Sequence, residues 1–248
     1  MNIKAKIPNF ITLLNLLSGC IAVVFVARDQ FELAFFFVCL GIFLDFFDGF
    51  FARLFKVQSP LGVQLDSLAD MVTSGLVPGY VMYKLLLNFN KSKELVSICE
   101  RDYKWLELDN LWPFLGFIIT LGSCYRLAKF NIDTRQTDSF IGLPTPANAL
   151  FILSIPLVIA STEITFLKEA LTNSYILMVI SILSVYMMNA EISLFSLKMK
   201  NFSWQNSKFQ IIFLLLAVIL IVTLKIVALP IIILLYVLMS VIQNKMTS

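Results

Sequence analysis

The sequence contains no histidine. Without it, the chain lacks the commonest general base near neutral pH, every catalytic triad built on imidazole, and any zinc site that needs an imidazole ligand. Its four cysteines, Cys20, Cys39, Cys99 and Cys124, are dispersed, and three of them lie inside apolar stretches. We interpret them as small buried residues, and not as a disulfide framework or a metal cage.

Charged residues are also scarce. They make up 14% of the 248 residues, against 59% hydrophobic residues, and the mean hydropathy is +0.87. A soluble domain has about a quarter of its residues charged, so this chain has too few polar side chains to cover a water-facing surface. The formal net charge of +3 is too small to indicate nucleic-acid binding. The composition therefore predicts an integral membrane protein.

Apolar stretches close to the bilayer-spanning length of about 20 residues recur along the whole chain. We place membrane spans at 10–27, 31–53, 63–84, 111–130, 144–161, 173–190, 209–225 and 226–243. The sequence therefore predicts an all-α, polytopic transmembrane helix bundle of about eight spans, formed by a single domain over residues 1–248. The last two spans form a tight hairpin around Lys225 and Pro230, and six spans remain if this hairpin lies only at the interface.

Lysine and arginine are unevenly distributed among the predicted loops. With the N-terminus inside, the cytoplasmic side receives Lys4, Lys6, Arg53, Lys56, Arg126, Lys129, Arg135, Lys198, Lys200, Lys208 and Lys245. The short loops on the other side hold only Arg28, Lys168 and Lys225. The long segment 85–110 mixes both signs of charge and counts for less. The positive-inside rule then predicts that both termini lie in the cytoplasm.

Four aspartates interrupt the apolar pattern. Asp45 and Asp48 lie near the end of the second span, and Asp66 and Asp70 lie at the start of the third. Spacings of three and four residues place each pair on one face of its helix. The connecting segment contains Pro60, where the chain turns back. We therefore expect both pairs to meet at the same membrane depth, near the cytoplasmic surface.

Carboxylates that face one another repel unless cations neutralise them. Oxygen ligands without histidine or thiolate suit Mg²⁺ or Mn²⁺, and two such ions can clamp a pyrophosphate. The four aspartates alone leave three interpretations open: an enzyme, a proton or cation pathway in a transporter, or a loop whose acids face water.

The residues around the aspartates complete a longer pattern. Segment 45–70 reads D-x2-D-G-x2-A-R-x8-G-x3-D-x3-D, with fixed positions at Asp45, Asp48, Gly49, Ala52, Arg53, Gly62, Asp66 and Asp70. It resembles the signature of the CDP-alcohol phosphotransferase family at every fixed position. The resemblance implies a core of six spans, a site for two divalent metal ions at the cytoplasmic face, and transfer from a CDP-activated lipid to an alcohol.

The resemblance also implies roles for individual residues. The four aspartates would be metal ligands, and Asp70 would also act as the base that takes the proton of the acceptor hydroxyl. Contacts with the CDP-lipid would come from Gly49, Ala52, Arg53, Gly62, Asn9 and Thr12. Gly62 would in addition allow the tight turn into the third helix. Taken alone, Gly49 and Ala52 are also typical of close helix packing, and Arg53 of a headgroup anchor.

Four further segments bear on the acceptor alcohol. They read IPNFITLLNLLSGCIAVVF, LDSLADMVTSGLVPG, YRLAKFN and FIGLPTPANALF, and they resemble bacterial and archaeal phosphatidylserine synthases over most of residues 7–150. This favours L-serine as acceptor, with Arg126, Lys129 and Asn131 binding serine or a lipid phosphate. Positive-inside anchors are the alternative interpretation. Lys129 stands where these synthases often have arginine, so it keeps the charge but loses the two-pronged guanidinium contact.

Two alternatives remain. Within the same class, the protein could be a phosphatidylglycerophosphate synthase or another CDP-alcohol phosphotransferase. In a different class, it could be a cation-coupled transporter, but the acids gather at one membrane face and not at the midplane between repeats. The lack of histidine excludes the phospholipase-D-like route to phosphatidylserine. By analogy with the family, we also expect a homodimer.

Overall fold

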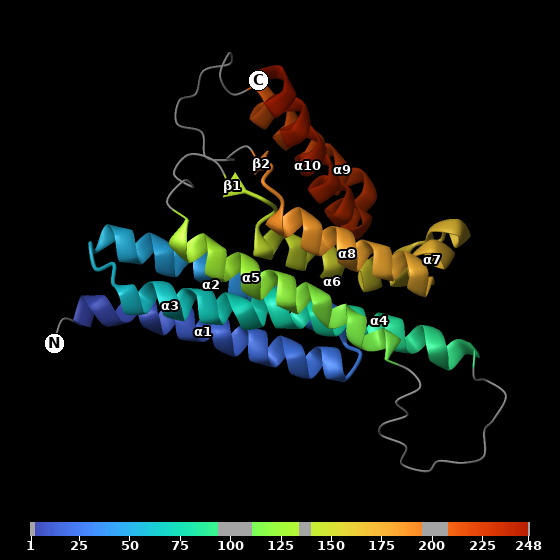
Figure 1. Cartoon of the computed structure of the whole chain (residues 1–248), viewed down its shortest axis with the longest axis horizontal. Coiled ribbons are helices and arrows are strands. Elements are labelled where there is room, and N and C mark those ends of the chain that lie inside the picture. The colour runs from blue at the N-terminus through green and yellow to red at the C-terminus, as the bar shows by residue number, and fades with distance from the viewer. Residues whose placement is uncertain (1–2, 94–110, 134–139, 195–207, 248) are drawn as a thin grey trace, which may run out of the picture.

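The computed structural model describes residues 3–93, 111–133, 140–194 and 208–247. Within them the chain is almost entirely helical (Figure 1). The α-helices are α1 (Ile3–Ala27), α2 (Phe31–Leu54), α3 (Pro60–Asp70), α4 (Val77–Lys93), α5 (Ile118–Ile132), α6 (Thr145–Ser161), α7 (Thr165–Thr172), α8 (Ser174–Asn189), α9 (Lys208–Leu224) and α10 (Ala228–Thr247). Shorter elements are the π-helix η1 (Met71–Leu76), the 3₁₀ turns η2 (Trp112–Phe117) and η3 (Lys225–Val227), and the strands β1 (Phe140–Ile141) and β2 (Ser193–Leu194), which pair antiparallel.

Every predicted span falls on helical structure, so the all-α prediction is confirmed apart from the two-residue strand pair. Three helical stretches are long and apolar enough to cross a membrane: Lys6–Ala27, Phe31–Leu54 and Phe209–Gln243. Helices α7 and α8 are bent by 70° relative to each other and form a fourth stretch if they are taken together. These helices make the chain an integral membrane protein. Helix α7 was not predicted.

The apolar stretch Phe209–Gln243 folds back on itself. Lys225 takes a left-handed backbone conformation, with φ of 51°, at the break between α9 and α10. The rings of Phe213 and Tyr236 lie 5.6 Å apart, whereas a straight helix would hold them about 34 Å apart. Figure 1 shows the two helices side by side. The predicted hairpin around Lys225 is therefore confirmed.

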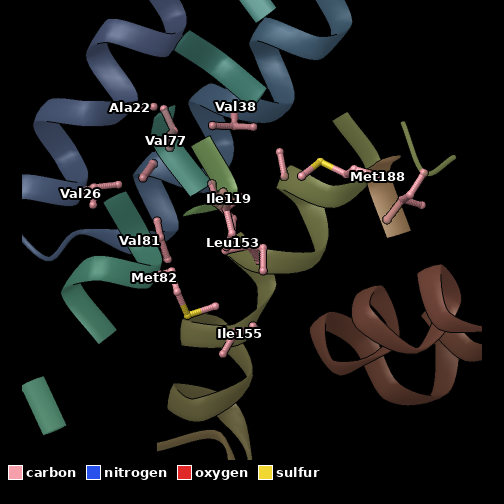
Figure 2. Close-up of a cluster of buried hydrophobic side chains, with 14 of the residues drawn as sticks. Ala22, Val26, Val38, Val77, Val81, Met82, Ile119, Leu153, Ile155 and Met188 are labelled. Atoms are coloured by element: carbon pink, nitrogen blue, oxygen red, sulfur yellow. The ribbon is translucent and has the colours of Figure 1, made fainter. Parts of the chain in front are cut away.

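The core lies where α1, α2, α4, α5, α6 and α8 meet. Figure 2 shows Ala22 and Val26 of α1 near Val77 and Val81 of α4, and all four side chains are fully buried. Small and β-branched residues let these helices approach closely, which matters in lipid because contact between packed surfaces, and not escape from water, holds the helices together. Helix α1 also packs along α2 and α3, the two helices that carry the acids.

The turn between α2 and α3 positions the signature residues. Lys56 has a φ of 55°, and the Val57 amide donates to the Ala52 carbonyl at 3.0 Å. This is the pattern of a left-handed helix ending, usually supplied by glycine. Helix α3 then starts at Pro60, with Ser59 as its N-terminal cap.

The expectation that Gly62 makes this turn is wrong. Gly62 lies in the first turn of α3, where its amide donates to Ser59 Oγ at 3.1 Å. A Cβ at Gly62 would lie 3.3 Å from both Asn9 Oδ1 and Ser59 Oγ. The missing side chain thus makes room for α1 beside the start of α3, while Lys56 provides the reversal.

Candidate active site

Three of the four aspartates come together between α2 and α3. Asp45, Asp48 and Asp66 each offer a carboxylate oxygen, and these oxygens all lie within 4.8 Å of one another. The predicted meeting of the two helices is confirmed for these three residues. Asp70, one turn further along α3, interacts electrostatically with Asp45 and Asp66 but lies outside the three-carboxylate group.

The three-carboxylate group fits a divalent metal ion. Asp48 is only 6% exposed, and Asp66 Oδ1 is buried without a hydrogen-bond partner among the described residues. A buried carboxylate oxygen beside two other carboxylates is unfavourable unless a cation meets it. The donors are all oxygens, which are the ligands that Mg²⁺ and Mn²⁺ prefer.

Helix α1 contacts this acidic group through Thr12. Thr12 Oγ1 lies 2.5 Å from Asp48 Oδ2 and 3.1 Å from the Pro8 carbonyl oxygen, and its single proton can go to either acceptor. The hydroxyl is buried, with the residue 3% exposed. Thr12 therefore orients one carboxylate of the group.

A cavity of about 610 Å³ opens beside the acids, which is within the usual range for small-molecule sites. Asp48 and Asp66 form part of its lining. All six residues predicted to contact the CDP-lipid also line it: Asn9, Thr12, Gly49, Ala52, Arg53 and Gly62. A Cβ at Gly49 would meet only the Arg53 guanidinium nitrogens, at 3.8 Å. The backbone of α2 is therefore open to an occupant of the cavity at this point.

Arg126 lies on the buried side of α5. It is 7% exposed, its Nε has no hydrogen-bond partner among the described residues, and its guanidinium carbon sits 5.9 Å from the centre of the Phe130 ring. It also interacts electrostatically with Asp70. A buried guanidinium with an unused donor beside an acidic centre is suited to bind an anionic group.

The other two predicted acceptor residues lie apart from each other. Lys129 Nζ lies 3.6 Å from the Glu191 carboxylate and lines a small cavity of about 10 Å³ together with Arg126, space for about one water molecule. Asn131 lines the large cavity instead, and its amide nitrogen lies 2.9 Å from Ser67 Oγ. The structure therefore does not gather Arg126, Lys129 and Asn131 into one pocket.

Two buried residues near Asp70 were not predicted. Asn15 Nδ2 donates to Asp70 Oδ1 at 3.3 Å. Thr73 Oγ1 lies 2.9 Å from Asn15 Oδ1 and 3.2 Å from the Asn15 backbone carbonyl oxygen, and its single proton can go to either acceptor. Thr73 belongs to η1, the π-helix that follows Asp70 directly, and such turns are frequent at functional sites. The signal available in the sequence was an asparagine in the middle of an apolar span, where a polar side chain is costly.

The site thus combines a metal-fitting group of carboxylates with a large cavity in an apolar helical protein. The chain matches the family model of CDP-alcohol phosphatidyltransferases over residues 5–187. It belongs to this family, and the resemblance found in segment 45–70 is confirmed. The protein is therefore a transferase of phospholipid synthesis.

Individual relatives carry a more specific name. The chain is 33% identical over 144 residues to the CDP-diacylglycerol–serine O-phosphatidyltransferase of Bacillus subtilis (strain 168), covering 56% of this chain and 69% of that protein. The enzyme of the same name from Helicobacter pylori (strain ATCC 700392 / 26695) is 32% identical over 185 residues, 73% of this chain and 69% of the relative. The enzyme of the same name from Methanocaldococcus jannaschii is 31% identical over 147 residues, which cover 59% of this chain and 58% of that protein.

Proposed function

We propose that the protein transfers the phosphatidyl group of CDP-diacylglycerol to the hydroxyl of L-serine, giving phosphatidylserine and CMP. The observation that carries the proposal is the cavity, because it brings the predicted CDP-lipid contacts next to Asp48 and Asp66. Serine is supported by the names of the relatives, at about one third identity.

The acids supply the chemistry in this proposal. Asp45, Asp48, Asp66 and Asp70 would hold two Mg²⁺ or Mn²⁺ ions, which would supply positive charge against the pyrophosphate and the leaving CMP. Asp70 takes the proton of the serine hydroxyl. The serine oxygen then forms a bond to the phosphorus that bears the lipid, and the bond from this phosphorus to the CMP oxygen breaks.

The residues of the cavity hold the donor in place. Arg53 binds a phosphate oxygen, while Gly49 and Ala52 let the nucleotide approach the backbone of α2. Asn9 and Thr12 make further contacts from α1. Holding the two reactants together in this way can supply much of the rate acceleration.

Arg126 is the proposed partner of the serine carboxylate. Its buried Nε, which has no hydrogen-bond partner among the described residues, supports this role. Arg126 also interacts electrostatically with Asp70, so a serine carboxylate bound to Arg126 would lie near the base. Asn131, at the wall of the cavity, and Lys129, near Arg126, bind serine or the lipid phosphate in this proposal.

The experiment that tests the proposal measures CMP release. Purified protein receives CDP-diacylglycerol, Mg²⁺ or Mn²⁺, and one alcohol at a time. We expect the fastest release with L-serine. Release that is ten times faster with glycerol 3-phosphate would contradict L-serine as the acceptor but would agree with the proposed class of reaction. No release with any alcohol would contradict the transferase reaction itself and favour the transporter.

We also propose that the chain forms a single domain of eight spans, with both termini and the active site in the cytoplasm, and that it forms a homodimer. The turn between α2 and α3 tests the orientation, because Ser59 lies in it. A single cysteine at Ser59, in a variant without the natural cysteines, should react with an impermeant thiol reagent only in inside-out vesicles. Labelling of intact cells would show that the orientation is the reverse of the one proposed. Arg135, Lys198 and Lys200, which entered the charge count, lie outside the described residues.

A further inference from the structure

We infer that Asn15 and Thr73 form a positioning pair that holds the carboxylate of Asp70 in the orientation needed for proton transfer. The inference rests on the proposed role of Asp70 as base. Neither residue belongs to the signature in segment 45–70, and neither lines the large cavity. They act on the reaction through Asp70.

The pair forms a chain of two hydrogen bonds across three elements. Thr73 Oγ1 of η1 lies 2.9 Å from Asn15 Oδ1 of α1, the nearer of its two acceptors, and 3.2 Å from the Asn15 backbone carbonyl oxygen. Asn15 Nδ2 donates to Asp70 Oδ1 of α3 at 3.3 Å. Asn15 and Thr73 are both 0% exposed. Because buried polar groups lose free energy when they are left unpaired, this arrangement resists local rearrangement.

The two ends of the Asn15 amide are not equivalent. Its oxygen can only accept, and its nitrogen can only donate. The Thr73 hydroxyl can donate to the oxygen, and the nitrogen faces the Asp70 carboxylate. The reversed amide would place an oxygen against a carboxylate oxygen, which is repulsive. The Asp70 carboxylate therefore selects the nitrogen end of Asn15, and Thr73 Oγ1, 2.9 Å from Asn15 Oδ1, supports the amide in that orientation.

Glycines let the helices close around the pair. A Cβ at Gly19 of α1 would lie 2.5 Å from Thr73 Oγ1, and a Cβ at Gly41 of α2 would lie 2.7 Å from Thr73 Cγ2 and 2.8 Å from Asn15 Oδ1. Side chains at these positions cannot be accommodated without displacing the pair. Close packing at Gly19 and Gly41 therefore holds Thr73 and Asn15 in a fixed position.

This arrangement assigns different tasks to the two oxygens of Asp70. Oδ1 accepts from Asn15, so Oδ2 is the oxygen that takes the proton of the acceptor hydroxyl. Loss of the pair lets the carboxylate rotate, and fewer molecules then hold Oδ2 in position. The effect should appear in kcat, while the KM for CDP-diacylglycerol stays unchanged.

Two substitutions at Thr73 separate the hydroxyl from the packing. Thr73→Val keeps the shape but removes the hydroxyl, and we expect kcat to fall about 10- to 100-fold, the usual effect of losing a partner that orients a group at a metal centre. Thr73→Ser keeps the hydroxyl and loses the methyl group near Gly41, and it should retain most of kcat. Asn15→Ala should be at least as impaired as Thr73→Val. If the Val and Ser variants are equally impaired, packing is responsible and the inference is wrong.

Ser18→Ala is the matched control. Ser18 lies one turn beyond Asn15 on α1, is 3% exposed, and donates to the Phe37 carbonyl at 2.7 Å. It should lower the melting temperature and leave kcat unchanged.

Asp70→Asn separates this inference from the proposed function. Normal transfer by Asp70→Asn would contradict the proposed base, and the positioning role with it. An inactive Asp70→Asn beside a Thr73→Val variant with wild-type kcat would contradict the positioning pair alone.

Discussion

The acid-bearing region, α1 to η1, and the C-terminal hairpin, α9 and α10, are both highly apolar, but they use their polar side chains differently. In the acid-bearing region, buried polar groups bond between helices: Thr12 to Asp48, and Asn15 to Asp70. In the hairpin, the Ser240 hydroxyl donates to the carbonyl of Tyr236, four residues earlier in its own helix. The acid-bearing helices are thus joined to one another through polar side chains, whereas Ser240 bonds within its own helix.

The family match agrees with this contrast. It covers residues 5–187 and ends before the hairpin. Helix α10 contacts α6 and β2 but none of the acid-bearing helices to a comparable extent. We therefore expect substitutions in the acid-bearing region to change the reaction and substitutions in the hairpin to change only stability.

The largest effect should follow loss of a metal ligand. Asp45→Asn, Asp48→Asn or Asp66→Asn removes a charge from the three-carboxylate group, and CMP release should fall by about 10²- to 10³-fold, as when a preorganised electrostatic partner is removed. The measurement is CMP release as a function of Mg²⁺ and Mn²⁺ concentration. Asp29→Asn is the matched control, because Asp29 lies in the connection between α1 and α2 and pairs with Lys84 at 2.9 Å. Full wild-type activity in excess EDTA would contradict the metal site.

Asp70→Asn should have the next largest effect. The amide cannot take a proton, so transfer should fall by about 10²-fold or more, the usual contribution of a general base. Binding of CDP-diacylglycerol, measured separately, should persist. Turnover close to that of the wild type would place the base elsewhere.

The acids illustrate what the sequence predicts well. Spacings of three and four residues fix a helical face, and one turn between two spans brings both faces together, so Asp45, Asp48 and Asp66 could be placed without knowledge of the rest of the bundle. The hairpin at Lys225 was predictable for the same reason. Its two apolar stretches are adjacent in sequence, with a single break between them.

Contacts between distant segments were beyond such local reasoning. Asn15 meets Asp70 and Thr73 only because three helices pack together at Gly19 and Gly41. Likewise, Lys129 and Asn131 are two residues apart on α5, but their side chains line different cavities. Spacing along one helix gives the direction of a side chain and not the partner that it meets.

Arg126→Ala tests whether the active site extends beyond the acid-bearing region, because Arg126 lies on α5, outside segment 45–70. Loss of a hydrogen bond to a charged group costs about 1.5–3 kcal/mol. The KM for serine should therefore rise, or kcat fall, by at least about tenfold. The concentration of Mg²⁺ or Mn²⁺ for half-maximal rate should not change. Arg28→Ala, in the exposed connection after α1, is the control. An unchanged KM and kcat for serine would remove Arg126 from the acceptor site.

Phe213→Ala should have the smallest effect on the reaction, because it should change stability alone. Phe213 is 5% exposed, and its ring lies 5.6 Å from that of Tyr236 across the hairpin. Because Phe213 belongs to the buried core, the substitution leaves a cavity, which costs about 3–5 kcal/mol for a buried phenylalanine. The melting temperature in detergent should drop, and Phe213→Leu should drop it less. CMP release per folded molecule should match the wild type, because α10 packs mainly against α9, α6 and β2, which carry none of the four aspartates. A fall in kcat as large as that of Arg126→Ala would show that the hairpin shapes the active site, and the division between the two regions would be wrong.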